Sequence, residues 1–262
     1  MSDLYSSICI SSVKSTILEL MGLEKTQGDD DSNPVIKALA QEKKIDRAVI
    51  YNPDAVALWV YQKYTEKFTS AAVNSDLALP MLSVMPSVTP VCFASMYTGV
   101  MPEVHGIRKY EKPVLRTETV FDRFLAAGKK CAIVSTEGDS ISKIFLERDM
   151  DYFIYGSEDE VNAKTLELIR ENKYDLLVIY NGDYDGFMHK FGPESEEALG
   201  RLDMNVATYG NIVGAIREYM PGNRVFYGFC PDHGCHEIDG ECGSHGLDMP
   251  EDINILHTYV MV

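Results

Sequence analysis

The sequence predicts an α/β fold in which a mostly parallel central sheet is covered by helices on both faces. Short apolar runs typical of strands alternate with longer segments of helical periodicity along the 262 residues. This alternation is typical of parallel sheets whose strands are connected by helices. A content of 45% hydrophobic and 24% charged residues is that of a globular protein with a substantial core.

Seven short apolar runs are the predicted strands. They are AVIY (48–51), MLSV (81–84), CAIV (131–134), YFIY (152–155), DLLVIY (175–180), RVFYGF (224–229) and HTYVMV (257–262). Helices are expected between them, at 11–22, 34–43, 55–67, 117–127, 158–172 and 194–219. In the segment 117–127, Thr117 precedes the run FDRFLAA and Gly128 follows it, which is typical of a helix start and a helix end.

The simplest partition of the chain is one domain, residues 1–262, with residues 1–34 as a helical N-terminal lead and linker. The stretch QGDDDSNP (27–34) has the composition of a linker and separates the first helix from the first strand. No internal repeat and no low-complexity tract is visible in the sequence.

The net charge of the chain argues against some classes of binding partner. A formal net charge of −16 sets up a negative field that repels nucleic acid polymers and anionic membranes. An anionic small molecule would therefore need local positive charge, which bound cations can supply. The first residues lack the features of a signal peptide, no stretch approaches 18 apolar residues, and the six cysteines are too sparse for a disulfide scaffold. These features favour a cytoplasmic protein with free thiols, and the sequence does not indicate an oligomeric state.

Acidic residues and histidines follow several of the predicted strands. Thr89 follows the second run. The acids and histidines are Asp54 after AVIY, Asp183, Asp185 and His189 after DLLVIY, and Asp232 and His233 after RVFYGF. Because ligands of open α/β sheets bind beyond the carboxyl ends of the strands, these side chains are candidates for one site.

Four segments resemble the alkaline phosphatase superfamily, and most of all its nucleotide pyrophosphatase/phosphodiesterase branch. They are MPSVTPVCFASMYTGVMPEVHGI (85–107), DYDGFMHKFGP (183–193), DHG (232–234) and SHG (244–246). The resemblance covers roughly residues 45–250. It implies the core fold of that superfamily, with Thr89 as a nucleophile that becomes phosphorylated.

The resemblance also implies two divalent metal ions, zinc or manganese. It assigns Asp185, His189 and His245 to one ion, and Asp54, Asp232 and His233 to the other, together with Thr89. Two cations about 4 Å apart can bind both the attacking and the leaving oxygen of a phosphoryl group. The implied function is hydrolysis of a small phosphoric ester, as in a phosphodiesterase, through a phosphothreonine intermediate.

Simpler interpretations stand beside these assignments. Asp54 and Thr89 are also residue types that cap helices, and either could precede one. Asp185 and His189 could be a pair on a surface helix, but Gly186 and the following Gly192 argue against a regular exposed helix.

The segment 233–245 raises an alternative of another class, a binding protein with a structural zinc knot. Its ligands would be Cys235, His236, Cys242 and His245, because thiolate and imidazole are zinc ligands. The usual two-residue spacing between the cysteines is missing. His105, His236 and His257 have no metal role in the resemblance, and we expect them to be structural.

The substrate is less constrained by the sequence. Thr89 and Asp185 are 96 positions apart, which leaves no room for a large cap domain and favours a hydrolase over a mutase. The diesterase branch has a phosphate-binding asparagine where this chain has Tyr110. Arg108 and Lys109 beside it could bind a second negative charge, so a phosphomonoesterase or an enzyme like phosphonoacetate hydrolase is the alternative.

Overall fold

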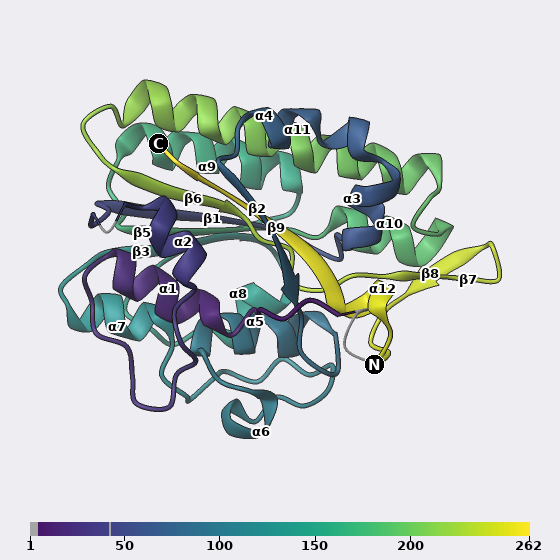
Figure 1. The fold of residues 1–262 in the computed structure, drawn as a ribbon, viewed down its shortest axis with the longest axis horizontal. Coiled ribbons are helices and arrows are strands. Elements are labelled where there is room, and N and C mark those ends of the chain that lie inside the picture. Colours follow the sequence, from purple (N-terminus) through teal and green to yellow (C-terminus); the bar gives the residue numbers. More distant parts are fainter. Residues whose placement is uncertain (1–4, 42) are drawn as a thin grey trace.

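The computed structural model describes residues 5–41 and 43–262, and its centre is a seven-stranded sheet (Figure 1). The strands lie in the order β2-β9-β6-β1-β5-β3-β4. Their bounds are β1 Arg47–Pro53, β2 Leu77–Leu82, β3 Cys131–Thr136, β4 Asp151–Tyr155, β5 Leu176–Asn181, β6 Val225–Phe229 and β9 Asn254–Met261. A separate hairpin joins β7 His236–Ile238 to β8 Cys242–Ser244.

Five neighbouring strands of the sheet run parallel. β1 pairs in parallel with β5 and β6, and β3 pairs in parallel with β5 and β4. β9 is antiparallel to both of its neighbours, β6 and β2, so β2 again runs in the direction of the parallel strands. The predicted mostly parallel sheet is confirmed, and the carboxyl ends of β1, β2, β5 and β6 meet at one edge.

All seven predicted strands are present, but two begin three or four residues earlier than predicted. β2 begins at Leu77 instead of residue 81, and β9 begins at Asn254 instead of residue 257. β2 lies at the end of the sheet, where its first four residues are partly exposed and where Pro80, which has no N–H group, is tolerated. A proline within an apolar run argues against a central strand, so the sequence pattern indicated a strand only after Pro80.

Helices cover both faces of the sheet, as predicted. The helices are α1 Ser12–Leu20, α2 Pro34–Leu39, α3 Leu58–Lys63, η1 Thr65–Phe68, α4 Thr69–Val73, α5 Thr89–Thr98, α6 Pro102–His105, α7 Val120–Ala126, α8 Ser140–Ile144, α9 Glu158–Glu171, α10 Asp183–Phe191, α11 Glu196–Tyr219 and α12 Pro250–Ile253. Figure 1 shows α1, α2, α5, α7 and α8 on one face and α3, α4, α9, α10 and α11 on the other. Successive strand residues alternate between the faces, so Ile50 packs with the first set and Val49 with the second.

Three predicted helices, at 11–22, 158–172 and 194–219, are confirmed as α1, α9 and α11. The helix expected at 34–43 ends earlier, at Leu39, and residue 42 lies outside the described residues. The helix expected at 55–67 begins only at Leu58, because Ala55 has a left-handed backbone with φ +61°, and it continues as η1 and α4.

Two local predictions are wrong. Thr119, not Thr117, caps α7, because Asp122 three residues later completes a capping box with it. Residues 183–191 do form a regular α-helix, α10. Gly186 is tolerated within it, and Gly192, with φ +89°, lies just beyond its end.

The N-terminal segment is part of the core. Lys14 of α1 is completely buried, forms an ion pair with Asp29 at 3.0 Å, and donates to the Thr98 carbonyl oxygen at the end of α5. Asp30 N–H donates to the carbonyl of Gly99, the C-cap of α5, so the predicted linker 27–34 is bound to the helix layer on this face of the sheet. Residues 1–4 of the predicted lead lie outside the described residues.

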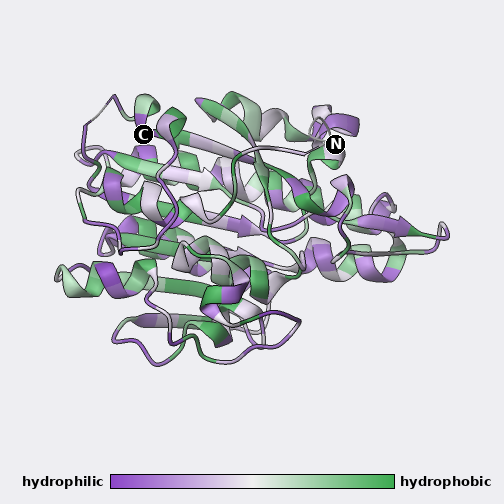
Figure 2. Ribbon diagram, turned by 60° about the horizontal axis from the view of Figure 1, so that its bottom comes forward, coloured by the Kyte–Doolittle hydropathy of each residue, from purple (hydrophilic) through white to green (hydrophobic). Residues whose placement is uncertain are grey.

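The distribution of hydropathy follows this architecture. Figure 2 shows hydrophobic residues along the strands and the inner helix faces, and mostly hydrophilic residues on the outer loops. Within residues 5–41 and 43–262, no helix combines the length and the apolar character needed to cross a bilayer.

Candidate active site

The carboxyl edge of the sheet gathers the residues that the sequence singled out. Asp54 follows β1, Thr89 follows β2, Asp185 lies in the helix that follows β5, and Asp232 follows β6. Two groups of side chains there have ligand atoms close enough to hold one ion each: Asp54, Asp232 and His233, and Asp185, His189 and His245. The structure thus brings together the same two sets of three that the sequence assigned to two metal ions.

The first group is almost completely buried. His233 Nε2 lies 3.3 Å from Asp54 Oδ1 and 3.4 Å from Asp232 Oδ2. The three side chains are at most 1% exposed. The chain directly after His233 packs against the backbone of Glu251. Only glycine fits at residue 234, because a β carbon there would lie 2.1 Å from the Glu251 carbonyl oxygen.

The second group depends on α10. Asp185 and His189 are one helical turn apart, and the Nε2 atoms of His189 and His245 each lie 3.4 Å from Asp185 Oδ1. The His245 ring stacks on the His233 ring with a centroid separation of 4.0 Å. The two groups are therefore direct neighbours.

Each of the three histidines is oriented through its Nδ1 atom. The Nδ1–H groups donate to backbone carbonyl oxygens: His233 to Gly234 at 2.9 Å, His189 to Gly243 at 3.0 Å, and His245 to Ser87 at 2.8 Å. These bonds leave Nε2 unprotonated in the neutral ring and pointed at the carboxylates. Histidines that bind metals are oriented in this way.

One oxygen of each carboxylate has no hydrogen-bond partner among the described residues. Asp54 Oδ1, Asp185 Oδ1 and Asp232 Oδ2 are buried and have no hydrogen bond from any described residue. Burial, together with the charge of Asp54, raises the pKa of both Asp185 and Asp232. Burial lowers the pKa of His233, and burial with the neighbouring His233 lowers that of His245 to about 2. Burying several carboxylates together without a compensating positive charge is unfavourable. Carboxylate oxygens and neutral imidazole nitrogens are ligands of divalent cations, so bound cations would compensate this charge.

The hydroxyl of Thr89 belongs to this cluster. Thr89 is the first residue of α5, and its Oγ1 lies 3.4 Å from Asp54 Oδ2 and 3.3 Å from His233 Nε2. The capping interpretations are wrong: the N-cap of α5 is Val88, and α3 begins four residues after Asp54, with Ala57 as its N-cap. Both side chains are free to act in the site.

A cavity of about 260 Å³ opens beside Thr89. It is lined by Asp54, Thr89, Tyr110, Lys112, Thr136, Asp139, Ser140, Tyr180, Gly182, Asp183, Asp185 and Gly186. Tyr110 is therefore at the cavity, as predicted for a substrate contact. Arg108 and Lys109 are not part of this lining: Arg108 donates to the Glu103 carbonyl, and Lys109 forms an exposed ion pair with Glu111.

Several cavity residues were not predicted as site residues, among them Tyr180, Lys112 and Asp139. Tyr180, the last residue of the predicted fifth strand, donates its hydroxyl hydrogen to Asp54 Oδ2. Lys112 donates to the Gly138 carbonyl at 2.9 Å and lies over the Tyr110 ring. Asp139 follows β3, and burial raises its pKa to about 6. The rule that site residues follow strand ends would have found Asp139, whereas Lys112 follows no strand.

The remaining histidines are structural, as predicted. His105 bonds to Ser95 and to the Ile107 N–H group, and His257 bonds to Tyr259 and to the Pro231 carbonyl. His236 Nδ1 is hydrogen-bonded to Oδ1 of the buried Asp252 at 2.7 Å.

The structural zinc knot is contradicted by this geometry. Cys235 is buried beside the Tyr184 hydroxyl, Cys242 lies on the hairpin, and His236 is bound to Asp252. Among the described residues, the cysteines belong to neither group that could hold an ion. His245 takes part in the second group instead.

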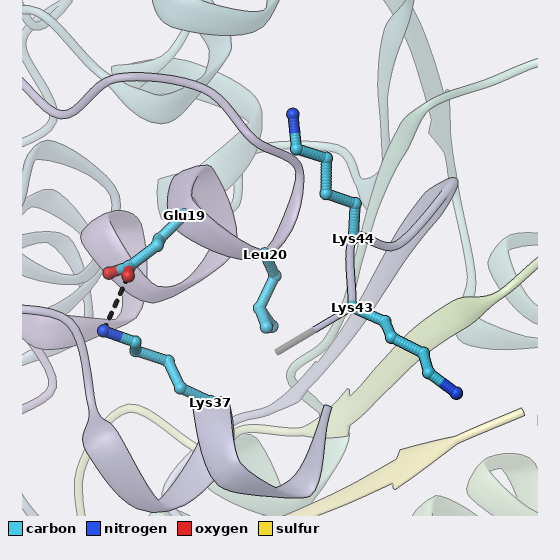
Figure 3. A pocket seen from close by; sticks show the side chains of 5 residues that line it. All are labelled: Glu19, Leu20, Lys37, Lys43 and Lys44. Carbon is cyan, nitrogen blue, oxygen red and sulfur yellow. Dashed lines mark ion pairs between the residues drawn. The ribbon is translucent and has the colours of Figure 1, made fainter. Parts of the chain in front are cut away.

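A larger cavity, of about 330 Å³, lies at the opposite edge of the sheet, before β1 begins. Its lining includes Lys37, Lys43 and Lys44. Figure 3 shows that Lys37 is paired with Glu19 and that Lys43 and Lys44 point in different directions. These charges do not converge on a ligand position.

The α/β sheet thus carries, at its carboxyl edge, a threonine hydroxyl beside two carboxylate–imidazole groups, an arrangement suited to binding two divalent cations. Residues 52–127 match the family model described as type I phosphodiesterase / nucleotide pyrophosphatase. No curated protein sequence matches the chain. The match confirms the predicted resemblance to the phosphodiesterase branch of the alkaline phosphatase superfamily.

Solved structures confirm the fold. Phosphonoacetate hydrolase from Sinorhizobium meliloti 1021, in complex with phosphonoformate, is 20% identical with a TM-score of 0.57, over 75% of this chain and 59% of that chain. An inactive variant of murine ectonucleotide pyrophosphatase/phosphodiesterase 5, in complex with AMP, is 15% identical with a TM-score of 0.59, over 73% and 57%. The human enzyme of the same name is 17% identical with a TM-score of 0.58, over 72% and 57%. The chain thus spans less than two thirds of the length of these structures.

Proposed function

We propose that the chain is a two-metal-ion hydrolase of small phosphoric esters that works through a phosphothreonine intermediate. A phosphodiesterase or nucleotide pyrophosphatase-like activity is the first candidate. The observation that carries the proposal is the position of Thr89 Oγ1, at a helix N-terminus and within 3.4 Å of both Asp54 and His233.

Asp54, Asp232 and His233 would hold one divalent ion, and Asp185, His189 and His245 the other. Imidazole with carboxylate suits zinc, and manganese is also compatible with this donor set. When bound, such ions lower the pKa of an adjacent hydroxyl and offset the charge of the phosphoryl group. The three unpartnered carboxylate oxygens supply the negative charge that two cations would neutralise.

The chain's own groups carry the two chemical steps. Thr89 Oγ1 loses its proton to solvent and attacks phosphorus, the bond from phosphorus to the leaving-group oxygen breaks, and the leaving group takes up a proton from water and departs as the alcohol. The N-terminus of α5 favours an anion through its dipole, although Pro90 has no N–H group and the Val91 and Cys92 N–H groups already donate to the Val88 carbonyl. Water then attacks the phosphothreonine, the bond between Oγ1 and phosphorus breaks, and Thr89 regains its proton.

A second candidate is a phosphomonoesterase, or an enzyme like phosphonoacetate hydrolase. Lys112 favours it, because its ammonium group lines the cavity and could bind a second negative charge on the substrate. Arg108 and Lys109, which the sequence proposed for this role, contact other groups. Tyr110 could donate a hydrogen bond to substrate in either candidate.

The net charge of −16 supports a small substrate rather than a nucleic acid polymer or a membrane surface. We also propose a cytoplasmic location, which the six free cysteines support.

Metal content and turnover together test the proposal. We expect about two zinc or manganese ions per chain, and chelation should abolish hydrolysis of nitrophenyl phosphate mono- and diesters until metal is restored. Asp185→Ala and Asp54→Ala should each lower the content by about one ion, whereas Asp203→Asn, on the surface of α11, should keep both. A protein that binds at most one ion, unaffected by Asp185→Ala, would contradict the two-ion site.

A further inference from the structure

Two of the three histidines in the metal groups lie in chain segments that belong to no helix or strand. His233 lies between the end of β6 at Phe229 and the start of β7 at His236, and His245 directly follows β8. The regular hydrogen bonds of a sheet or a helix therefore do not fix these two imidazoles. Other contacts have to place the segments that carry them, and Asp252 of α12 makes several of these contacts.

Asp252 is completely buried, and two of its oxygen atoms bind the segments of these two histidines. Its backbone carbonyl accepts from the Gly234 N–H group at 2.7 Å, directly after His233. Its Oδ2 accepts from the Leu247 N–H group at 2.8 Å, two residues after His245. One side chain and its own backbone thus connect a histidine of the first metal group with a histidine of the second.

The other carboxylate oxygen of Asp252 binds the β7–β8 hairpin. Oδ1 accepts from the Nδ1–H group of His236 at 2.7 Å, and His236 is the first residue of β7. β7 pairs with β8, whose Gly243 carbonyl accepts from His189 Nδ1. The orientation of His189, the third histidine, therefore depends on a hairpin that Asp252 holds in place.

A buried carboxylate is a costly residue if its only task is to fill the core. Removing a carboxylate from water is unfavourable unless hydrogen bonds or a cation compensate, and apolar residues of similar volume are often at least as stabilising. Hydrogen bonds constrain distance and angle, whereas the hydrophobic effect is not directional. Asp252 therefore suits the precise placement of its three partners better than it suits core packing.

We propose that Asp252 is a positioning residue that places the histidines of both metal groups for ion binding. The inference rests on the proposed function, because it concerns the ions of that site. Among the described residues, Asp252 belongs to neither group that could hold an ion, so it acts through the segments that it binds. Site residues have to lie within about 0.5 Å of the productive geometry, and release of these segments should therefore weaken the binding of both ions.

Calorimetric titration of the metal-free protein with zinc tests the proposal. Asp252→Ala removes both side-chain acceptors and should weaken the binding of both ions by about 10–100-fold. Asp252→Asn should retain most of the affinity. Its amide oxygen can accept from Leu247 N–H, and its amide N–H can donate to Nδ1 of the other neutral tautomer of His236. Both variants lose the same carboxylate charge, so a difference between them reports position and not charge.

Glu251→Ala is the matched control. Glu251 precedes Asp252 in α12, carries the same charge, and has a partly exposed side chain, so zinc affinity should be unchanged. Cobalt bound in place of zinc gives a second readout, because its visible absorption depends on the geometry of its ligands. The cobalt spectrum should change in Asp252→Ala and should stay as in the wild type in Asp252→Asn.

Circular dichroism and urea unfolding verify that the variants fold. If Asp252→Ala does not fold, His236→Phe replaces it, because the His236 side chain is 14% exposed and only the bond to the hairpin is lost. This variant should weaken the ion of His189 and His245 more than the other ion.

Zinc binding also separates this inference from the proposed function. If the wild type binds two zinc ions and hydrolyses no phosphoric ester, the proposed function fails, and the zinc affinities of the variants still decide the inference. Wild-type affinity in Asp252→Ala or His236→Phe, or equal weakening in Asp252→Ala and Asp252→Asn, would overturn it. A wild type that binds no zinc would overturn both.

Discussion

Ala55 directly follows Asp54 and holds a left-handed backbone, with φ +61°, although it carries a β carbon. That conformation costs an L-residue about 1–2 kcal/mol. Asp54 N–H continues the pairing with β5 by donating to the Asn181 carbonyl at 2.9 Å, and the turn at Ala55 then brings the Ala55 N–H group to 3.5 Å from Asp232 Oδ1. Strain at this residue thus helps to place a carboxylate of the site.

We expect Ala55→Gly to be better tolerated than Ala57→Gly, although both methyl groups are completely buried. Glycine relieves the strain at residue 55, whereas residue 57 has an ordinary φ of −70° and only loses its methyl group and backbone rigidity. Urea unfolding should show Ala57→Gly to be less stable than Ala55→Gly by about 1–2 kcal/mol. Equal losses would show that the left-handed turn is not strained.

Single residues differ in how far the sequence could predict them. Asp54, Asp232 and His233 follow the ends of strands. They are therefore identified both by the rule that ligands bind beyond the carboxyl ends of the strands and by the family motifs. Tyr180 could not be predicted as a site residue, because its contact with Asp54 depends on the register between β1 and β5. Lys112 reaches the cavity through a loop whose path no local pattern specifies.

At the scale of elements, the β7–β8 hairpin positions one metal group. The Gly243 carbonyl of β8 accepts from His189 Nδ1, and a β carbon on Gly243 would lie 2.4 Å from Met188 Sδ and 2.9 Å from the Met188 carbonyl oxygen. The hairpin can contact α10 this closely only because the residue is glycine. The sequence did not predict the hairpin, whose strands are three residues long and partly exposed.

Gly243→Ala should therefore displace the hairpin and weaken metal binding by about 10–100-fold, since the carbonyl that orients His189 would move. Isothermal titration with zinc measures the loss. Gly200→Ala is the control: it lies in α11 with open space around it, so zinc affinity should be unchanged and stability should rise by about 1 kcal/mol. Unchanged affinity in Gly243→Ala would mean that the hairpin does not position His189.

Element boundaries show where sequence patterns fail. The strongly apolar strands β1, β3 and β5 agree with their predictions to within two residues. α10 was rejected because glycine is unfavourable in helices, yet packing of Tyr184 and Met188 against the sheet layer outweighs that propensity. The free-energy cost of one glycine in a helix is small compared with the free energy gained by burying two large side chains.

At the scale of the whole molecule, the excess of 40 acidic over 24 basic residues makes stability depend on pH. Glu158, at the start of α9, is buried and accepts a hydrogen bond from the Asp183 N–H group. Burial, with the nearby charge of Asp183, raises the pKa of Glu158 to about 8. Because the pKa of Glu158 is higher in the folded than in the unfolded state, Glu158 contributes its full stabilisation at pH values below the ordinary pKa of a glutamate. This contribution falls as the pH rises and is lost once the pH passes about 8.

Glu158→Gln should flatten this dependence. Between pH 5 and 9 the free energy of unfolding of the wild type should fall relative to that of the variant, by up to about 4 kcal/mol. Asp159→Asn, an exposed neighbour on the same helical turn, should leave the slope as in the wild type. Parallel pH profiles for wild type and Glu158→Gln would show that Glu158 is ionised in the folded protein.

The central claim is that Thr89 becomes phosphorylated during turnover, and acid quenching followed by mass spectrometry tests it most directly. The peptide containing Thr89 should carry one phosphate in the wild type, and the corresponding serine peptide should carry it in Thr89→Ser. Thr89→Ala should show no phosphopeptide and should turn over on the order of 10³–10⁶-fold more slowly while retaining its metal ions. Near wild-type hydrolysis by Thr89→Ala, with no phosphate trapped on the wild-type peptide, would contradict the claim.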